Sequence, residues 1–250
     1  MRGVRLFAWV LGLAAFTAAA SGAQAGPVSA AAPLYLRLET PRGPVHVYRP
    51  AGVRPAAIVV YVHGFYTDAD TAWSAHELER KCEASRLPAV FVVPEAPQAA
   101  GEPVRWLDLD DLLDVVAKAR ARLVPRRLPV VAVGHSAAYR TIASWLESPR
   151  LREVILVDAL YGFEDAYEAW LRRPGRRMVV IVSTTDTWAR PFARRFKRKV
   201  SLDVLDAAPP PRARRARLVM VNTRIGHLEL VTEAEPLVRA MGLSRFTRKR

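Results

Sequence analysis

Three side chains that together could activate a hydroxyl group follow separate apolar segments of the chain. Ser136 comes just after the apolar segment 128–134, Asp186 follows the predicted strand 177–183, and His227 follows the predicted strand 218–222. A serine becomes a strong nucleophile when a histidine takes its proton, and a carboxylate fixes the tautomer of that histidine and stabilises its cation. The residue types therefore predict nucleophilic attack by Ser136, proton transfer by His227 and orientation of His227 by Asp186.

The choice of carboxylate has an alternative. Asp186 lies in the polar turn 183–191, between an apolar segment and a basic helical pattern. Asp158 ends the preceding apolar segment, and it is the alternative acid. Glu95 is a weaker candidate, because its position in a loop is more typical of a pocket wall or a helix cap. Of the two aspartates, the sequence favours Asp186.

The segment around Ser136 has the pattern of a nucleophile elbow. An apolar segment runs into Gly134-His135-Ser136-Ala137-Ala138, and a helical pattern follows. A serine at the tip of such a turn needs small residues two positions before and two after it. Gly134 meets this requirement, whereas Ala138 stands where glycine is usual. We interpret His135 as structural or pocket-lining, with its side chain directed away from Ser136.

Together with His63-Gly64 after an earlier apolar segment, this pattern resembles the α/β-hydrolase superfamily over about residues 34–242. The resemblance implies that Ser136 is the nucleophile, His227 the general base and acid, and Asp186 the orienting carboxylate. It also implies an oxyanion hole formed by the backbone N–H groups of Phe65 and Ala137. No subfamily is assigned.

Hydrophobic periodicity predicts an α/β fold with a mostly parallel sheet, helices on both faces and an edge β-hairpin at the N-terminus. The hairpin is expected at 34–40 and 45–48, because both segments alternate and a Pro/Gly turn separates them. Buried strands are expected at 56–62, 88–94, 128–134, 152–158, 177–183 and 218–222, and helices at 72–85, 104–123, 163–171, 189–197 and 228–241. Segment 200–205 is either a short strand or irregular, and 209–217 is expected to be a solvated loop. Active sites of such sheets lie beyond the carboxyl ends of the strands, where all the candidate residues fall.

The N-terminal 25 residues are expected to be a secretory signal peptide. Arg2 and Arg5 precede an apolar run, and a small-x-small site predicts cleavage after Ala25. Residues 26–33 form a linker, 34–243 a single hydrolase domain, and 244–250 a basic tail. We therefore expect an exported protein, periplasmic or secreted. The single Cys82 allows no internal disulfide.

The net charge of +14 favours contact with anionic surfaces of the cell envelope. An arginine-rich composition of this kind is equally typical of a GC-rich genome. The sequence contains no nucleic-acid-binding motif, and nucleic-acid binding would conflict with export. The chain contains no metal-ligand spacing and no glycine-rich phosphate loop, so neither a metal nor a cofactor is expected.

Aromatic residues near the predicted strand ends suggest a cleft for an acyl substrate, with Tyr66, Tyr161 and Trp188 as the substrate-binding candidates. By analogy with the superfamily, a carboxylic ester is the expected bond, cleaved through an acyl-enzyme. The substrate is expected to be a small molecule or an envelope polymer. Three alternatives stay open: an envelope amidase or peptidase, an acyltransferase on the same triad, or a non-catalytic envelope-binding protein. The sequence does not determine the oligomeric state.

Overall fold

The computed structural model describes residues 32–120, 123–205 and 209–248. The expected signal peptide, and all of the linker except residues 32 and 33, lie outside these ranges. Within them, no helix is long and apolar enough to cross a lipid bilayer.

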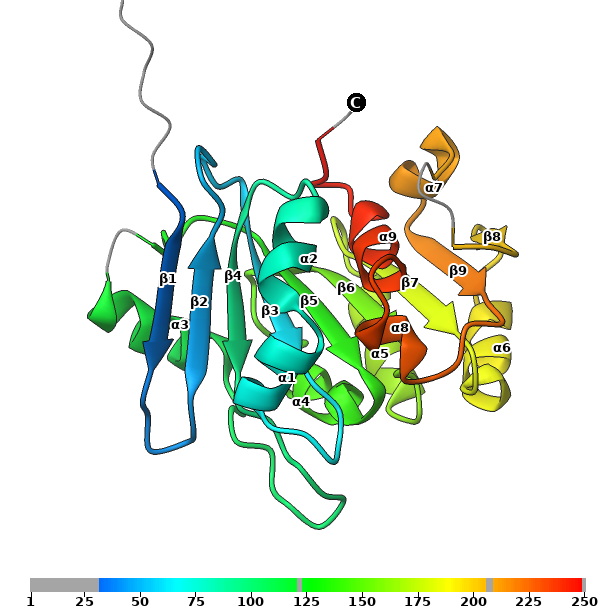
Figure 1. Ribbon diagram of the computed structural model, residues 1–250. Coiled ribbons are helices and arrows are strands. Elements are labelled where there is room, and N and C mark those ends of the chain that lie inside the picture. Colours follow the sequence, from blue (N-terminus) through cyan, green and yellow to red (C-terminus); the bar gives the residue numbers. More distant parts are fainter. Residues whose placement is uncertain (1–31, 121–122, 206–208, 249–250) are drawn as a thin grey trace, which may run out of the picture. The chain divides into compact units, whose positions relative to one another are not determined.

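The centre of the fold is a nine-stranded sheet in the order β1-β2-β4-β3-β5-β6-β7-β9-β8. The strands are β1 (Leu34–Leu38), β2 (Val45–Arg49), β3 (Ala57–Val62), β4 (Ala89–Pro94), β5 (Val130–His135), β6 (Leu151–Val157), β7 (Arg177–Val182), β8 (Val200–Leu202) and β9 (Leu218–Asn222). The strands from β3 onward run parallel, whereas β1 and β2 form an antiparallel hairpin at one edge (Figure 1). The predicted α/β fold with an N-terminal edge hairpin is confirmed.

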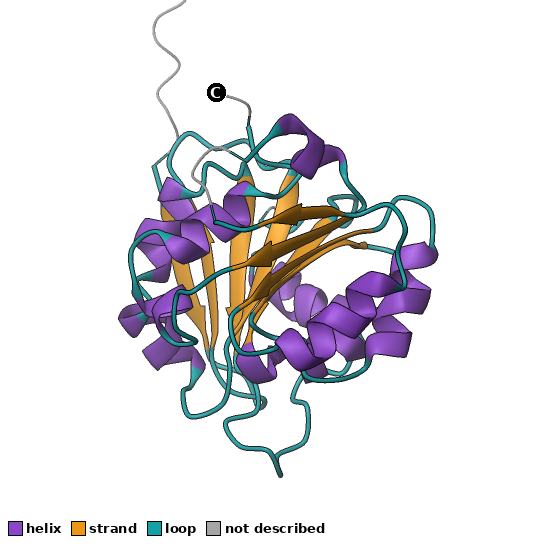
Figure 2. Ribbon diagram, turned by 90° about the vertical axis from the view of Figure 1, so that its right-hand side faces the viewer, coloured by secondary structure: helices purple, strands orange, loops and turns teal. Residues whose placement is uncertain are grey.

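Side chains of the central strands alternate between two apolar cores. On β3, Ile58 and Val60 face one core, while Val59 and Tyr61 face the other. Because both faces of the strand are covered, its sequence is a continuous apolar run without polar alternation. Figure 2 shows the sheet between two layers of helices.

The helices divide between these two faces. The first face is covered by α3 (Leu109–Ala119), α4 (Tyr139–Ser144), α5 (Glu164–Arg172) and α6 (Asp186–Arg194). The second face is covered by α1 (Ala69–Ala75), α2 (Leu78–Ala84), α7 (Pro211–Arg215), α8 (Glu229–Thr232) and α9 (Pro236–Gly242). Helices on both faces agree with the sequence-based expectation.

Several helix boundaries differ from those expected. The segment 72–85 forms two helices, because Glu77 takes a left-handed conformation between them. The segment 228–241 is also divided: Glu233 is extended, and Pro236 opens a new helix in its first turn, where a missing N–H costs nothing. For the same reason Pro211 begins the short helix α7 within a segment expected to be a loop.

Candidate active site

Ser136 lies at the sharp turn between β5 and the helical segment that follows it. Its φ angle is +54°, in the left-handed region that non-glycine residues seldom adopt. A three-residue 3₁₀ turn, Ser136–Ala138, connects the strand to α4. This strained backbone holds the serine beyond the end of β5, as expected of a nucleophile elbow.

Ala138 fits in the elbow because Gly134 has no side chain. A Cβ on Gly134 would lie 2.8 Å from the Cβ of Ala138 and 2.5 Å from Cδ1 of Ile142. Both distances are far below van der Waals contact. The methyl group of Ala138 and the end of Ile142 therefore fill the space that a side chain at position 134 would need. Because position 134 is glycine, the turn can accommodate alanine at position 138.

The loop after β3 packs directly against the serine. A Cβ on Gly64 would lie 2.7 Å from Cβ of Ser136 and 3.3 Å from its Oγ. Only glycine allows the two backbones to approach this closely. Phe65 follows Gly64, and Ala137 follows Ser136, so the two residues expected to supply oxyanion N–H groups lie on two touching loops.

Asp158, directly after β6, is fully buried and surrounded by donors. Its carboxylate accepts bonds from the backbone N–H groups of Ser183, Thr184 and Thr185 at 2.9–3.1 Å. It also accepts bonds from the hydroxyls of Thr184 (2.7 Å) and Thr185 (2.8 Å). Burial alone would raise the pKa of Asp158, but the hydrogen bonds from His227 and from this turn outweigh it and hold the pKa well below its ordinary value. Asp158 is therefore ionised.

The side chain that completes this set of donors is His227. Its Nδ1 donates to Oδ2 of Asp158 at 2.7 Å. The preference for Asp186 as the partner of His227 is corrected: Asp186 begins α6, is 48% exposed, and pairs with Arg190 one helical turn later at 2.7 Å. The physical reason is that the three residues before Asp186 wrap around Asp158 and carry Asp186 out to the surface.

His135 connects the nucleophile strand to the histidine loop. It is almost fully buried, and its Nε2 donates to the backbone carbonyl of His227 at 2.9 Å. The centroids of the two imidazole rings are 4.5 Å apart. Burial, and then the neighbouring His227, lower the pKa of His135 to about 3, so the ring is neutral. The interpretation of His135 as structural agrees with this contact.

Ser136 and His227 come to the same edge of the sheet through these contacts. His135 is the chain neighbour of Ser136, and its side chain holds the His227 loop. A second bond, from Oγ of Ser183 to the carbonyl of Ile225 (2.7 Å), fixes that loop to the turn around Asp158. In the described residues no hydrogen bond joins Oγ of Ser136 to His227. Such bonds often tighten only when substrate is bound.

Aromatic rings lie beside His227. Tyr161 is 6.4 Å from His227 between ring centroids, and Trp188 is 5.2 Å from Tyr161. The structure thus brings two of the three substrate-binding candidates together. It also adds Tyr139, 6.0 Å from Tyr161, and Phe163, 5.9 Å from Tyr139. We call Tyr139, Tyr161, Phe163 and Trp188 the aromatic rim.

The third candidate, Tyr66, is not part of the aromatic rim. Its side chain is 95% exposed, and its aromatic neighbour is Phe65, at 6.3 Å. Glu95 is buried: it accepts a bond from the N–H of Ala69 at the start of α1 and lies 3.2 Å from Nε2 of His63. Glu95 therefore acts as a helix cap behind the Gly64 loop. Among the described residues, no cluster of three or more histidine, cysteine or carboxylate groups could hold a metal ion.

Sequence reasoning missed the turn that holds Asp158 and two members of the aromatic rim. The Ser183-Thr184-Thr185 run carried a usable signal, because three consecutive donors after a strand favour a buried acceptor. Tyr139 and Phe163 carried no sequence signal for a place in the aromatic rim, because each stands where a helix is expected to begin.

Comparison with solved structures identifies the architecture. A feruloyl esterase module from Clostridium thermocellum, complexed with sinapinate, superimposes with a TM-score of 0.61 at 10% identity, over 89% of this chain and 91% of that one. The chain has the α/β-hydrolase fold. A ferulic acid esterase (TM-score 0.57, 11% identity, 86% and 98% covered) shares this α/β-hydrolase fold. So does an esterase from the hyperthermophilic archaeon Pyrobaculum calidifontis (TM-score 0.54, 14% identity, 84% and 82% covered).

Searches at the level of sequence gave no match. No protein-family model matches the chain, and no curated protein matches it. At 10–14% identity, the similarity to the three α/β-hydrolase structures concerns the fold.

Proposed function

We propose that this chain is a serine hydrolase that cleaves a carboxylic ester through an acyl-enzyme intermediate. The observation that carries the proposal is the Asp158–His227 pair, at 2.7 Å, at the same edge of the sheet as Ser136, which is held in a left-handed turn. An ionised carboxylate on Nδ1 leaves the lone pair of Nε2 free to accept a proton.

The reaction begins with Ser136. Its Oγ attacks the acyl carbon while its proton passes to Nε2 of His227, and the N–H groups of Phe65 and Ala137 stabilise the resulting oxyanion. When the intermediate collapses, the bond from carbon to the leaving oxygen breaks and His227 protonates the alcohol. Water then attacks the acyl-enzyme, His227 takes its proton and returns it to Ser136, and the acid is released. Asp158 stays ionised and stabilises the imidazolium in both steps.

The aromatic rim suggests how the substrate is held. Tyr161 lies next to the proposed base, Trp188 lies next to Tyr161, and Phe163 is exposed. Aromatic faces bind planar acyl or aryl groups through stacking and apolar contact. An ester is preferred to an amide because the three similar structures reported above are esterases.

Export of the enzyme is part of the proposal. The basic and apolar pattern of residues 1–25 supports a periplasmic or secreted location. Edman sequencing of protein recovered from the extracytoplasmic fraction is expected to start at Gly26. Recovery of an intact N-terminus in the cytoplasm would contradict export but leave the chemistry untouched.

Hydrolysis by a matched set of variants tests the activity. Purified residues 26–250 are incubated with 4-nitrophenyl esters of increasing acyl length, beside the corresponding anilides. The wild type is expected to release nitrophenol from esters faster than nitroaniline from anilides, and Ser136→Ala to be inactive. Equal rates for Ser136→Ala would refute the serine mechanism, and faster anilide cleavage would favour the amidase alternative.

A further inference from the structure

A basic groove lies at the edge of the sheet opposite to Ser136. Its volume is about 1190 Å³, and eight of its eleven lining residues are arginine or lysine. Lys199 directly precedes β8 and Arg217 directly precedes β9, so the groove lies at the amino ends of strands that run parallel to β5. It is separate from the proposed active site, which lies at the carboxyl ends.

Among the described residues, most of the positive charge in the groove has no neighbouring carboxylate. Arg172 pairs with Glu168 of α5 at 2.5 Å, and Arg195 pairs with Asp165 and Glu168 of the same helix at 2.5 and 2.9 Å. The other six basic residues have no carboxylate oxygen within 4.0 Å among the described residues. These six are Lys197, Arg198, Lys199, Arg212, Arg215 and Arg217. Gathering six like charges around one hollow costs folding free energy unless a ligand neutralises them.

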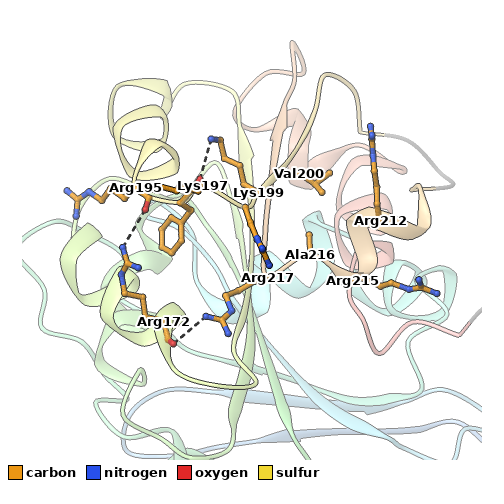
Figure 3. Close-up of a pocket in the computed structure, with 11 residues that line it drawn as sticks. Arg172, Arg195, Lys197, Lys199, Val200, Arg212, Arg215, Ala216 and Arg217 are labelled. Carbon is orange, nitrogen blue, oxygen red and sulfur yellow. Dashed lines mark hydrogen bonds between the residues drawn. The ribbon is translucent and has the colours of Figure 1, made fainter.

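The wall on the side of α5 and α6 is held by bonds between side chains and backbone (Figure 3). Arg217 donates to the carbonyl of Arg172 at 3.3 Å, and Arg172 donates to the carbonyl of Arg195 at 3.4 Å. The guanidinium of Arg172 also lies 5.3 Å from the ring centroid of Phe196. These contacts fix the ends of α5 and α6 against the start of β9.

The wall formed by α7 is anchored from beneath. Arg177 is buried and donates to the carbonyls of Ala213 (2.8 Å) and Ala216 (3.0 Å). Its guanidinium is paired with the buried carboxylate of Glu153. Because a charged pair inside the core positions α7, the exposed Arg212 and Arg215 are held at the groove by a fixed backbone.

We infer that this groove binds a soluble linear polyanion whose charged groups are phosphates. Arginine and lysine donate charge-assisted hydrogen bonds to phosphate oxygens, and basic residues on several walls of one hollow can contact successive phosphates of one chain. A flat bilayer would contact only the outer edge of the groove and would not reach the basic residues inside it. Single-stranded nucleic acid requires exposed rings for base stacking, whereas the one aromatic residue among the described lining, Phe196, is 8% exposed.

Binding of inorganic long-chain polyphosphate tests the proposal directly. Residues 26–250 are titrated with it at about 50 mM and about 150 mM salt, where counterion release makes the affinity fall steeply with salt. The groove variant is Lys199→Gln/Arg212→Gln/Arg215→Gln, which changes exposed residues on both walls. The matched control is Lys118→Gln/Arg54→Gln/Arg127→Gln, which removes the same charge from exposed positions elsewhere.

The groove variant is expected to bind about 100-fold more weakly at low salt, and the control within about threefold of the wild type. Ester hydrolysis should be unchanged in both variants. A failure to bind polyphosphate can therefore be distinguished from an absence of esterase activity. If the groove variant does not fold, Lys197→Gln/Arg198→Gln replaces it, with an expected loss of about tenfold.

Four results would overturn the inference. They are no binding of polyphosphate, equal loss in groove and control variants, tighter groove-dependent binding of single-stranded oligonucleotide, and binding of phosphatidylglycerol vesicles without binding of polyphosphate.

Discussion

The Nδ1 atom of His227 lies 2.7 Å from Oδ2 of Asp158, and the same carboxylate accepts three backbone N–H groups and two hydroxyls. This arrangement predicts that Asp158→Asn lowers kcat/KM by about 10³–10⁴-fold, because an amide cannot stabilise the imidazolium. Asp186→Asn is the matched control. It removes an exposed pair with Arg190 and is expected to stay within about twofold of the wild type. A larger loss of kcat/KM in Asp186→Asn than in Asp158→Asn, on the same ester, would show that Asp186 orients His227.

The elbow predicts a steric effect at Gly134. Gly134→Ala should destabilise the fold by about 1–3 kcal/mol, because the new methyl overlaps Ala138 and Ile142. Ala138→Gly in the same chain removes one overlap and should recover part of the loss. Urea unfolding followed by circular dichroism measures both changes. A fully stable Gly134→Ala variant would show that the turn can widen.

His135 predicts how stability depends on pH. Its pKa is lowered to about 3 in the folded chain, against 6.5 as its ordinary value. The unfolded chain therefore binds more protons between these values, and stability falls as the pH drops below 6.5. His135→Gln keeps an N–H donor for the His227 carbonyl but cannot titrate. From pH 6.5 to 4, the free energy of unfolding should fall less steeply in the variant, by up to about 1.4 kcal/mol per pH unit. Equal slopes would mean that His135 is not buried as neutral imidazole.

The aromatic rim predicts selective binding. Trp188→Ala should raise KM about three- to tenfold for an aromatic acyl ester and leave the acetate ester nearly unchanged, because one aromatic contact is lost. Trp188→Phe should restore most of the affinity. Initial-rate kinetics on the two esters separates KM from kcat. Equal increases for both substrates would indicate that Trp188 supports the loop and does not contact the acyl group.

Strand ends explain why much of the candidate site could be predicted from the sequence. Ser136 and His227 each follow a recognisable apolar segment, and parallel strands bring their carboxyl ends to one edge. Asp158 and Asp186 both meet that criterion. The distance of each aspartate from the end of its strand could have decided between them. Asp158 directly follows Val157, whereas Asp186 comes four residues after Val182. The three residues between Val182 and Asp186 supply the hydrogen-bond donors that enclose Asp158.

The boundaries that could not be predicted depend on tertiary contacts. The buried Lys81 of α2 donates to the carbonyls of Val231 (2.5 Å) and Thr232 (3.3 Å), which end α8. Nothing in the local pattern of 228–241 reveals a partner 150 residues away in the chain. Likewise, α7 depends on Arg177 beneath it, so its arginine-rich sequence alone is typical of a solvated loop.

Covalent labelling reports whether Ser136 is the nucleophile. Residues 26–250 are treated with a fluorophosphonate, and intact mass and peptide mapping locate the adduct. We expect one adduct on Ser136, which is absent from folded Ser136→Ala and forms much more slowly in Asp158→Asn. A folded wild-type chain that takes up no label, or a label on a residue other than Ser136, would contradict this expectation.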